Sequence, residues 1–359
     1  MKKIFSVFFI IVLLFNICIF QSFAESQLDV SARSAVVICA ETGEVVYSKN
    51  MNECLSMAST TKIMTAILAL EYGADDEYLT VTENMVAVEG TSMGLKDGDS
   101  VSLKSLVKGM LLKSGNDAAN AVANIVGGDI TTFVKMMNEK AKEIGMYSTS
   151  FETPSGLDGE NHYSTAFDMA ILGAYAIRNP EFRSICSAEN MVVYYGAPPY
   201  RRVLTNHNKL LKMYDGAFGI KTGFTKKSGR CLVSAVEKDS KTLVAVTLNA
   251  PDDWNDHIKM YDYAFNNVSS ISLEAKTENI KLNIVGGTKK EISVKADCVP
   301  AITVKNCNLK YSPEVFIKQF EYAPVKKGEI VGKIVYYSNN VKLAETNLVA
   351  TEAVSCVEK

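Results

Sequence analysis

Two polar side chains, Ser59 and Lys62, stand three residues apart at the start of an apolar run, in the segment MASTTKIMTA. Residues three apart on a helix share one face, so a hydroxyl and an amine at this spacing can meet. A serine hydroxyl attacks a carbonyl when a base takes its proton, and a neutral lysine can be that base. Free lysine has a pKa of about 10.4, so the proposal requires burial of Lys62 or a second cation beside it.

The spacing alone has an ordinary alternative explanation, a serine that caps a helix and a solvated lysine. The same S-x-x-K pattern recurs at Ser105 and Lys108. Other motifs must therefore decide between a structural and a catalytic role.

The segment LLKSGNDAANA places Ser114 and Asn116 directly before a second helical pattern. A hydroxyl and an amide two residues apart can line a polar cleft, one relaying protons and the other holding a substrate amide. A capped helix start explains the same residues equally well.

The segment GIKTGFT predicts a strand that carries Lys221 and the hydroxyls of Thr222 and Thr225, which suit a carboxylate. A glycine inside a strand, here Gly223, often marks the close approach of a ligand or another backbone. A substrate peptide can lie along such an edge as an extra strand. The order S-x-x-K, S-x-N, K-T-G is of the kind found in class A β-lactamases and penicillin-binding proteins, and it selects Ser59 over Ser105.

The elements around these motifs predict an α+β fold. Residues 34–47 indicate two strands around a Thr-Gly turn, helical patterns dominate from Ser59 to about Ala176, and strands return in GAFGIKTGFT, GRCLVSAVEK and KTLVAVTLNA. A last helix opens at Trp254, for which packing is the favoured role. We expect one antiparallel sheet covered by helices, with an inserted helical subdomain.

The two ends of the chain differ from this middle part. Lys2 and Lys3, an apolar stretch and the small residues Ser22 and Ala24 predict a signal peptide over residues 1–24, with an uncleaved anchor as the alternative. The sequence therefore predicts an exported protein whose three motifs lie in one domain over residues 25–271, which the resemblance described below implies to be a serine peptidase domain. Residues 272–359 alternate with a period of two and predict a small all-β domain, a spacer or docking module.

Composition excludes several other classes of function. The 359 residues are 47% hydrophobic and 22% charged, and the net charge of −2 offers no general attraction to nucleic acid. The cysteines are scattered without a C-x-x-C pair, so we expect no disulfide framework, no metal site and no cofactor. A local bridge between Cys298 and Cys307 is the one pairing that the spacing suggests.

The sequence resembles the serine-type D-alanyl-D-alanine carboxypeptidases, the low-molecular-mass penicillin-binding proteins of peptidoglycan metabolism. The resemblance is carried by the three motifs and by segments such as TPSGLDGENHYSTAFDMAILG and TNHNKLLKMYDGAFGIKTGFTKKSGRCLVSA. It covers residues from about Ser34 to Asn267, and the β domain is similar to the family's C-terminal domain. It implies a β-lactamase/transpeptidase-like fold, peptidoglycan stem peptides ending in D-Ala-D-Ala as substrates, and β-lactams as covalent inhibitors.

The resemblance also implies roles for the motif residues. Ser59 forms the acyl-enzyme ester, Lys62 accepts its proton, and Ser114 relays a proton towards the leaving amine. Lys221 and Thr222 hold the substrate's terminal carboxylate and tune Lys62, and the N–H groups of Ser59 and Phe224 form the oxyanion hole. The remaining members of the implied site are Asn116, Gly223 and Thr225.

The sequence departs from the family pattern in three places. The basic residue that often precedes K-T-G and contacts the substrate carboxylate has only His207 or Lys209 as candidates here, and His162 is expected to have a structural or surface role. The ending LVATEAVSCVEK has no amphipathic helix, which leaves membrane association open. Two alternatives stay open as well, a serine β-lactamase, although no E-x-x-L-N segment is present, and a non-catalytic penicillin-binding sensor.

Overall fold

The computed structural model describes residues 28–275 and 280–357, so the predicted signal peptide, residues 1–24, lies outside the described residues. Buried apolar side chains form one large cluster within residues 36–248 and another within residues 273–354. Within the described ranges, no helix is both long and apolar enough to cross a bilayer.

The sheet that carries the K-T-G segment is antiparallel throughout and has the strand order β2-β1-β9-β8-β7. The predicted early hairpin and the later meander are confirmed as its strands, which are β1 (Ser34–Cys39), β2 (Val45–Lys49), β7 (Ala217–Thr225), β8 (Gly229–Lys238) and β9 (Lys241–Leu248). Because β7 lies at the edge, one side of its backbone has no neighbouring strand in this sheet. An extended peptide can add there.

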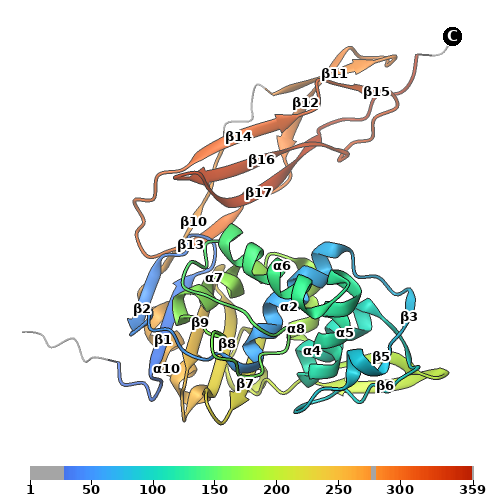
Figure 1. Ribbon diagram of the computed structural model, residues 1–359. Helices are drawn as coiled ribbons and strands as arrows, with labels where there is room; N and C mark the ends of the chain where they lie inside the picture. The colour runs from blue at the N-terminus through green and yellow to red at the C-terminus, as the bar shows by residue number, and fades with distance from the viewer. Residues whose placement is uncertain (1–27, 276–279, 358–359) are drawn as a thin grey trace, which may run out of the picture. The chain divides into compact units, whose positions relative to one another are not determined.

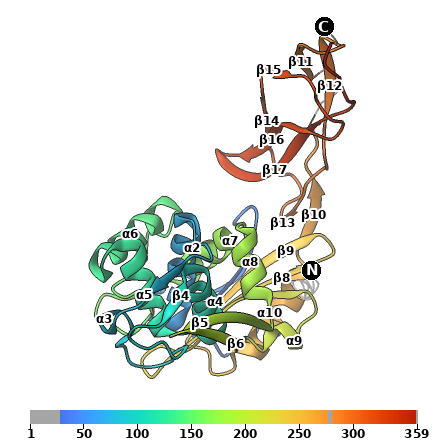
Figure 2. The same ribbon diagram turned by 90° about the vertical axis from the view of Figure 1, so that its right-hand side faces the viewer.

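Helices cover both faces of this sheet. Gly173 of α7 (Ala166–Ala176) packs against Val233 and Val244, whereas His257 of α10 (Asp253–Phe265) hydrogen-bonds Ser234 and Thr247. Neighbouring residues of a strand point to opposite faces, so α7 and α10 cover opposite faces of the sheet. Figures 1 and 2 show this arrangement, with α2 (Lys62–Tyr72), α4 (Leu103–Lys113), α5 (Asn116–Gly127), α6 (Ile130–Glu143) and α8 (Pro180–Ser187) on the side of α7.

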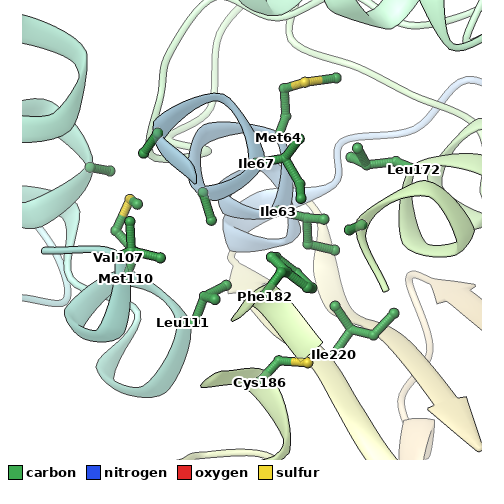
Figure 3. Close-up of a cluster of buried hydrophobic side chains, with 14 of the residues drawn as sticks. Ile63, Met64, Ile67, Val107, Met110, Leu111, Leu172, Phe182, Cys186 and Ile220 are labelled. Atoms are coloured by element: carbon green, nitrogen blue, oxygen red, sulfur yellow. The ribbon is translucent and has the colours of Figure 1, made fainter. Parts of the chain in front are cut away.

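The helix α2 (Lys62–Tyr72) is the central element of the helical region and follows the 3₁₀ turn η1 (Ala58–Thr61). Figure 3 shows Ile63 of α2 beside Phe182 and Ile220, while side chains of α4 lie on another side of the helix. The helix ends as predicted at Gly73, whose φ of 100° suits glycine. The other helices are α3 (Glu83–Val86), α4 (Leu103–Lys113), α5 (Asn116–Gly127), α6 (Ile130–Glu143), α8 (Pro180–Ser187) and α9 (Leu210–Met213).

A second small sheet, with the order β3-β4-β5-β6, was not predicted from the sequence. Its strands are β3 (Tyr78–Thr80), β4 (Ser100–Ser102), β5 (Asn190–Gly196) and β6 (Pro199–Thr205). The first two span three residues each, which is too short for alternation to be recognised. The hairpin of β5 and β6 could have been predicted, because valines and tyrosines, which favour strands, surround a Gly-Ala-Pro-Pro turn.

The C-terminal region is all-β, as predicted. One sheet pairs β10 (Ser269–Ser272) with β13 (Ala301–Val304), and a larger one has the order β14-β16-β17-β12-β11-β15. Alternate residues of its strands, such as Leu282, Ile292 and Val294, are buried in the core. The strands of the larger sheet are β11 (Lys281–Val285), β12 (Glu291–Ala296), β14 (Ser312–Ile317), β15 (Phe320–Tyr322), β16 (Ile330–Ser338) and β17 (Val341–Ala350).

The suggested bridge between Cys298 and Cys307 is wrong. Both cysteines are free and exposed. The Cys298 Sγ lies 3.4 Å from the Thr346 hydroxyl of β17, whereas Cys307 follows β13. Closeness in sequence therefore does not make these two thiols partners in the fold.

Candidate active site

Ser59 lies in the turn η1, which packs directly against the edge strand β7. An added Cβ at Gly223 would lie 3.1 Å from the Ala58 Cβ, the Met57 carbonyl oxygen and the Ser59 nitrogen. A side chain at this position would push the neighbouring backbone away by a few tenths of an ångström, so glycine allows the closest approach. The close approach of another backbone, predicted for this glycine, is thus present, and it brings the backbone of β7 beside the N–H of Ser59.

Lys62 is fully buried and points at Ser59. Its Nζ lies 2.9 Å from the Ser59 Oγ, 2.7 Å from the Asn116 Oδ1 and 2.5 Å from the Ser155 carbonyl oxygen. Burial, and then the neighbouring Lys221, hold the pKa of Lys62 well below its usual range, against an opposing effect of Asp117. The condition that the sequence placed on Lys62, a buried amine beside the serine, is met.

Ser114 and Asn116 come from the junction of α4 and α5. Ser114 ends α4 in the left-handed conformation, with a φ of 59°. The Asn116 side chain accepts from Lys62 and donates to the Glu89 carbonyl oxygen at 2.7 Å, so its Nδ2 holds a loop of the protein where we expected a substrate amide. Asp117 ties down the next part of that loop, because its carboxylate accepts from the backbone N–H groups of residues 93–95.

Lys221 and Thr222 lie on β7, as predicted, with their side chains on opposite faces of the strand. Lys221 is buried, its Nζ donates to the Thr222 carbonyl oxygen at 2.8 Å, and burial lowers its pKa to about 7. The hydroxyl of Thr225 lies 2.9 Å from the Ser228 Oγ, inside the turn that joins β7 to β8. The Thr225 hydroxyl already donates to Ser228, so this arrangement does not favour the predicted contact with a substrate carboxylate, which stays a prediction.

A cavity of about 550 Å³ opens at these elements. Its lining includes Ser59, Ser114, Thr222, Gly223 and Phe224 from the predicted site, and Lys62, Asn116 and Lys221 are buried behind it. The other lining residues are Thr91, His207, Lys209, Arg230, Pro251, Asp252, Asp253 and Trp254. The fold has thus brought the three motifs to one cleft.

The two candidates for a basic residue before K-T-G, His207 and Lys209, both line this cavity. Burial, together with the nearby Lys221 and Lys113, lowers the pKa of His207, so its imidazole is disfavoured as a cation. Lys209 also lines the cavity and stays a candidate.

His162 has a structural role and is not a surface residue. It is buried, its Nε2 lies 2.9 Å from the Thr61 hydroxyl, and its Nδ1 accepts from the Glu152 N–H. Burial lowers its pKa to about 4, which keeps the ring neutral. The ring thereby joins the loop at 152 to the turn that carries Ser59.

Sequence reasoning missed several residues of the cleft. The Ser155 carbonyl oxygen that contacts Lys62 gives no sequence signal, because any residue supplies a carbonyl. Arg230 could have been found, since the short turn after Thr225 places it opposite Phe224 in the hairpin register. Trp254, for which packing was favoured, lies at the wall of the cavity next to Asp253.

Comparison with known sequences agrees with this geometry. Residues 21–252 match the sequence profile of the D-alanyl-D-alanine carboxypeptidases, peptidase family S11. The chain belongs to this family. Residues 270–355 match the C-terminal domain of penicillin-binding protein 5. Family membership confirms the predicted serine peptidase, and it supports neither the β-lactamase nor the sensor.

Individual relatives extend over most of the chain. The D-alanyl-D-alanine carboxypeptidase DacF of Bacillus subtilis is 34% identical over 91% of this chain and 87% of its own length. DacC of Escherichia coli is 31% identical over 91% of this chain and 85% of its own. The crystal structure of penicillin-binding protein 5 from Haemophilus influenzae is 28% identical, with a TM-score of 0.65 over 91% of this chain and 98% of that one.

Proposed function

We propose that this family member removes the terminal D-alanine from peptidoglycan stem peptides ending in D-Ala-D-Ala, through an acyl-enzyme on Ser59. The observation that carries the proposal is the Nζ of Lys62, buried 2.9 Å from the Ser59 Oγ. The same serine is expected to react with β-lactams, whose strained carbonyl takes the place of the scissile one.

Acylation follows from the neutral form of Lys62. A neutral amine has two N–H donors and one lone pair, and two of the three contacts of Nζ are oxygen acceptors, Asn116 Oδ1 and the Ser155 carbonyl. Donation to these two oxygens directs the lone pair at the Ser59 hydroxyl. Lys62 then takes the proton as Ser59 Oγ forms its bond to the substrate carbonyl carbon.

The negative charge that develops on the substrate oxygen needs fixed donors. The contact of Gly223 with η1 places the Ser59 N–H beside the segment that carries the Phe224 N–H, and we assign these two N–H groups to the oxyanion hole. Removing one such donor typically costs about 10²–10³ in rate. The tight packing of β7 on η1 is therefore a requirement of the chemistry.

The two halves of the reaction share the same proton carriers. Ser114 lines the cavity and is assigned to pass the proton from Lys62 to the leaving amine of D-alanine. Loss of that proton leaves Lys62 neutral again, so that it can activate the water that cleaves the Ser59 ester. Lys221 lies behind Thr222, where its charge favours both the neutral form of Lys62 and binding of a carboxylate.

We further propose that the protein is exported and acts at the cell envelope, since its substrate lies outside the cytoplasmic membrane. The proposal includes a signal peptide over residues 1–24, a peptidase domain over 25–271 and a β domain over 272–359. Neither membrane attachment nor nucleic-acid binding is part of it.

The test combines two substrates with one variant. Wild-type protein is incubated with a fluorescent penicillin and with an acyl-D-Ala-D-Ala peptide, alongside Ser59→Ala. We expect free D-alanine from the peptide and a long-lived penicillin label, both lost in the variant. Rapid penicillin hydrolysis without D-alanine release would replace the carboxypeptidase with a β-lactamase, and labelling without any turnover would indicate a sensor.

A further inference from the structure

Arg230 is a charged residue of the cavity whose role the proposed function leaves open. It lies on β8, the strand next to the K-T-G strand, and is paired with Phe224 in the hairpin. Residues opposite each other in an antiparallel pair point to the same face, and so does Thr222, two residues from Phe224. The three side chains therefore share one face, and all three line the cavity that holds Ser59.

The guanidinium of Arg230 is held by a buried carboxylate from another element. Its Nε donates to the Asp253 Oδ1 at 2.9 Å and its Nη2 to the Oδ2 at 3.1 Å. Asp253 lies in the first turn of α10, its side chain is only 3% exposed, and it also accepts from the Trp254 N–H. The Arg230 Cζ lies over the Trp254 ring, 5.6 Å from the centroid of that ring.

This pairing leaves part of the arginine available. A guanidinium has five N–H donors in a planar fork, and Asp253 takes those on one edge. The Nη1 edge has no acceptor among the residues that the structure describes, and the side chain is 42% exposed. A fixed, half-exposed guanidinium edge is suited to a carboxylate, which it can bind with two parallel hydrogen bonds.

We propose that Arg230, positioned by Asp253, binds the C-terminal carboxylate of the substrate beside Thr222. The inference rests on the proposed function and gives Arg230 the role that His207 and Lys209 were expected to fill. His207 is disfavoured as a cation, and Lys209 is a single flexible ammonium that lacks the planar fork of Arg230. Asp252 also lines the cavity, where its carboxylate accepts a hydrogen bond from the Asn255 side chain. Its negative charge disfavours binding of a carboxylate near it.

The experiment compares two peptides that differ only at the terminus. An acyl-D-Ala-D-Ala peptide carries the carboxylate, and its D-alaninamide analogue does not. We expect wild-type protein to prefer the acid in kcat/KM. Arg230→Ala should lower kcat/KM for the acid about 10- to 100-fold, the usual effect of losing a hydrogen-bonded charge, and leave turnover of the amide unchanged. Turnover of the amide also shows that the variant is folded.

Matched variants separate the alternatives. Arg183→Ala removes another guanidinium, which is 40% exposed and paired with Glu237, and it should leave kcat/KM unchanged for both peptides. Asp253→Asn should raise KM for the acid more than it lowers kcat, because it loosens the guanidinium without touching substrate. If Arg230→Ala does not fold, Arg230→Gln, whose amide can still donate to Asp253, should show the same loss of preference.

Two results would overturn the inference. Full preference for the acid in Arg230→Ala, with the preference lost in Lys209→Ala, would assign the carboxylate to Lys209 and leave the proposed function intact. Wild-type protein that releases D-alanine from neither peptide would instead overturn the proposed function, and the role of Arg230 with it.

Discussion

The contact between Gly223 and η1 allows a quantitative prediction for Gly223→Ala. The new methyl group would meet three atoms at 3.1 Å, including the Ser59 nitrogen, whereas ordinary contacts begin at 3.4 Å. The strand and the turn must therefore separate by about 0.3 Å or more. The backbone at Gly223 does not require glycine for its conformation, so the crowding is the whole perturbation.

Two costs follow from this separation. Overpacking typically destabilises a protein by about 1–3 kcal/mol. The larger effect is expected on acylation, because the separation moves the Ser59 N–H relative to the Phe224 N–H, the two groups assigned to the oxyanion hole. Loss of one such donor lowers the rate by about 10²–10³, and a shift of about 1 Å can lower it by about 10². We expect the acylation rate to fall about 10- to 100-fold.

The assay is the second-order rate constant of labelling by a fluorescent penicillin, with D-alanine release measured in parallel and stability measured by urea unfolding. Gly173→Ala is the matched control, because its Cβ would be equally crowded, at 3.0–3.2 Å from Val244, Val233 and Ile220 on the sheet. It should lose stability but keep its acylation rate. If Gly223→Ala acylates as fast as Gly173→Ala, the tight packing of β7 on η1 does not position the oxyanion donors.

Two further predictions concern the lysines. Asn116→Asp replaces an amide oxygen 2.7 Å from the Lys62 Nζ with a carboxylate, which should raise the pKa of Lys62. The acylation rate near neutral pH should then fall by about 10²–10⁴ and recover at higher pH. A pH profile of acylation that matches the profile of Asn124→Asp would refute this. Burial lowers the pKa of Lys221 from 10.5 to about 7. Between pH 7 and pH 10.5 the unfolded chain therefore binds more protons at this lysine than the folded protein does. The free energy of unfolding of the wild type should then rise by about 1.4 kcal/mol per pH unit from this group. Urea unfolding at several pH values should show that Lys221→Met lacks this rise, and equal slopes for the two proteins would contradict the burial argument.

Much of the fold was predictable because its signals are local. The helix from Lys62 to Tyr72 and its stop at Gly73 follow from an apolar run and a glycine, and the β7–β8 hairpin follows from alternation around a polar turn. The sheet β3-β4-β5-β6 was missed because its first two strands are too short for alternation and owe their conformation to pairing with each other and with β5.

The sequence by itself determined the motif residues, their order and the family, because side-chain chemistry and spacing are written in the chain. It could not decide whether Lys62 is an ordinary surface amine or a base. That depends on the Asn116 side chain and the Ser155 carbonyl, which lie 54 and 93 residues from Lys62 in the chain. Tertiary packing also fixed Arg230 on Asp253, 23 residues away, and so identified a cation for the cleft that spacing relative to K-T-G did not suggest. Burial and charge at such a site arise from segments that meet only in the folded protein, and local sequence does not encode them.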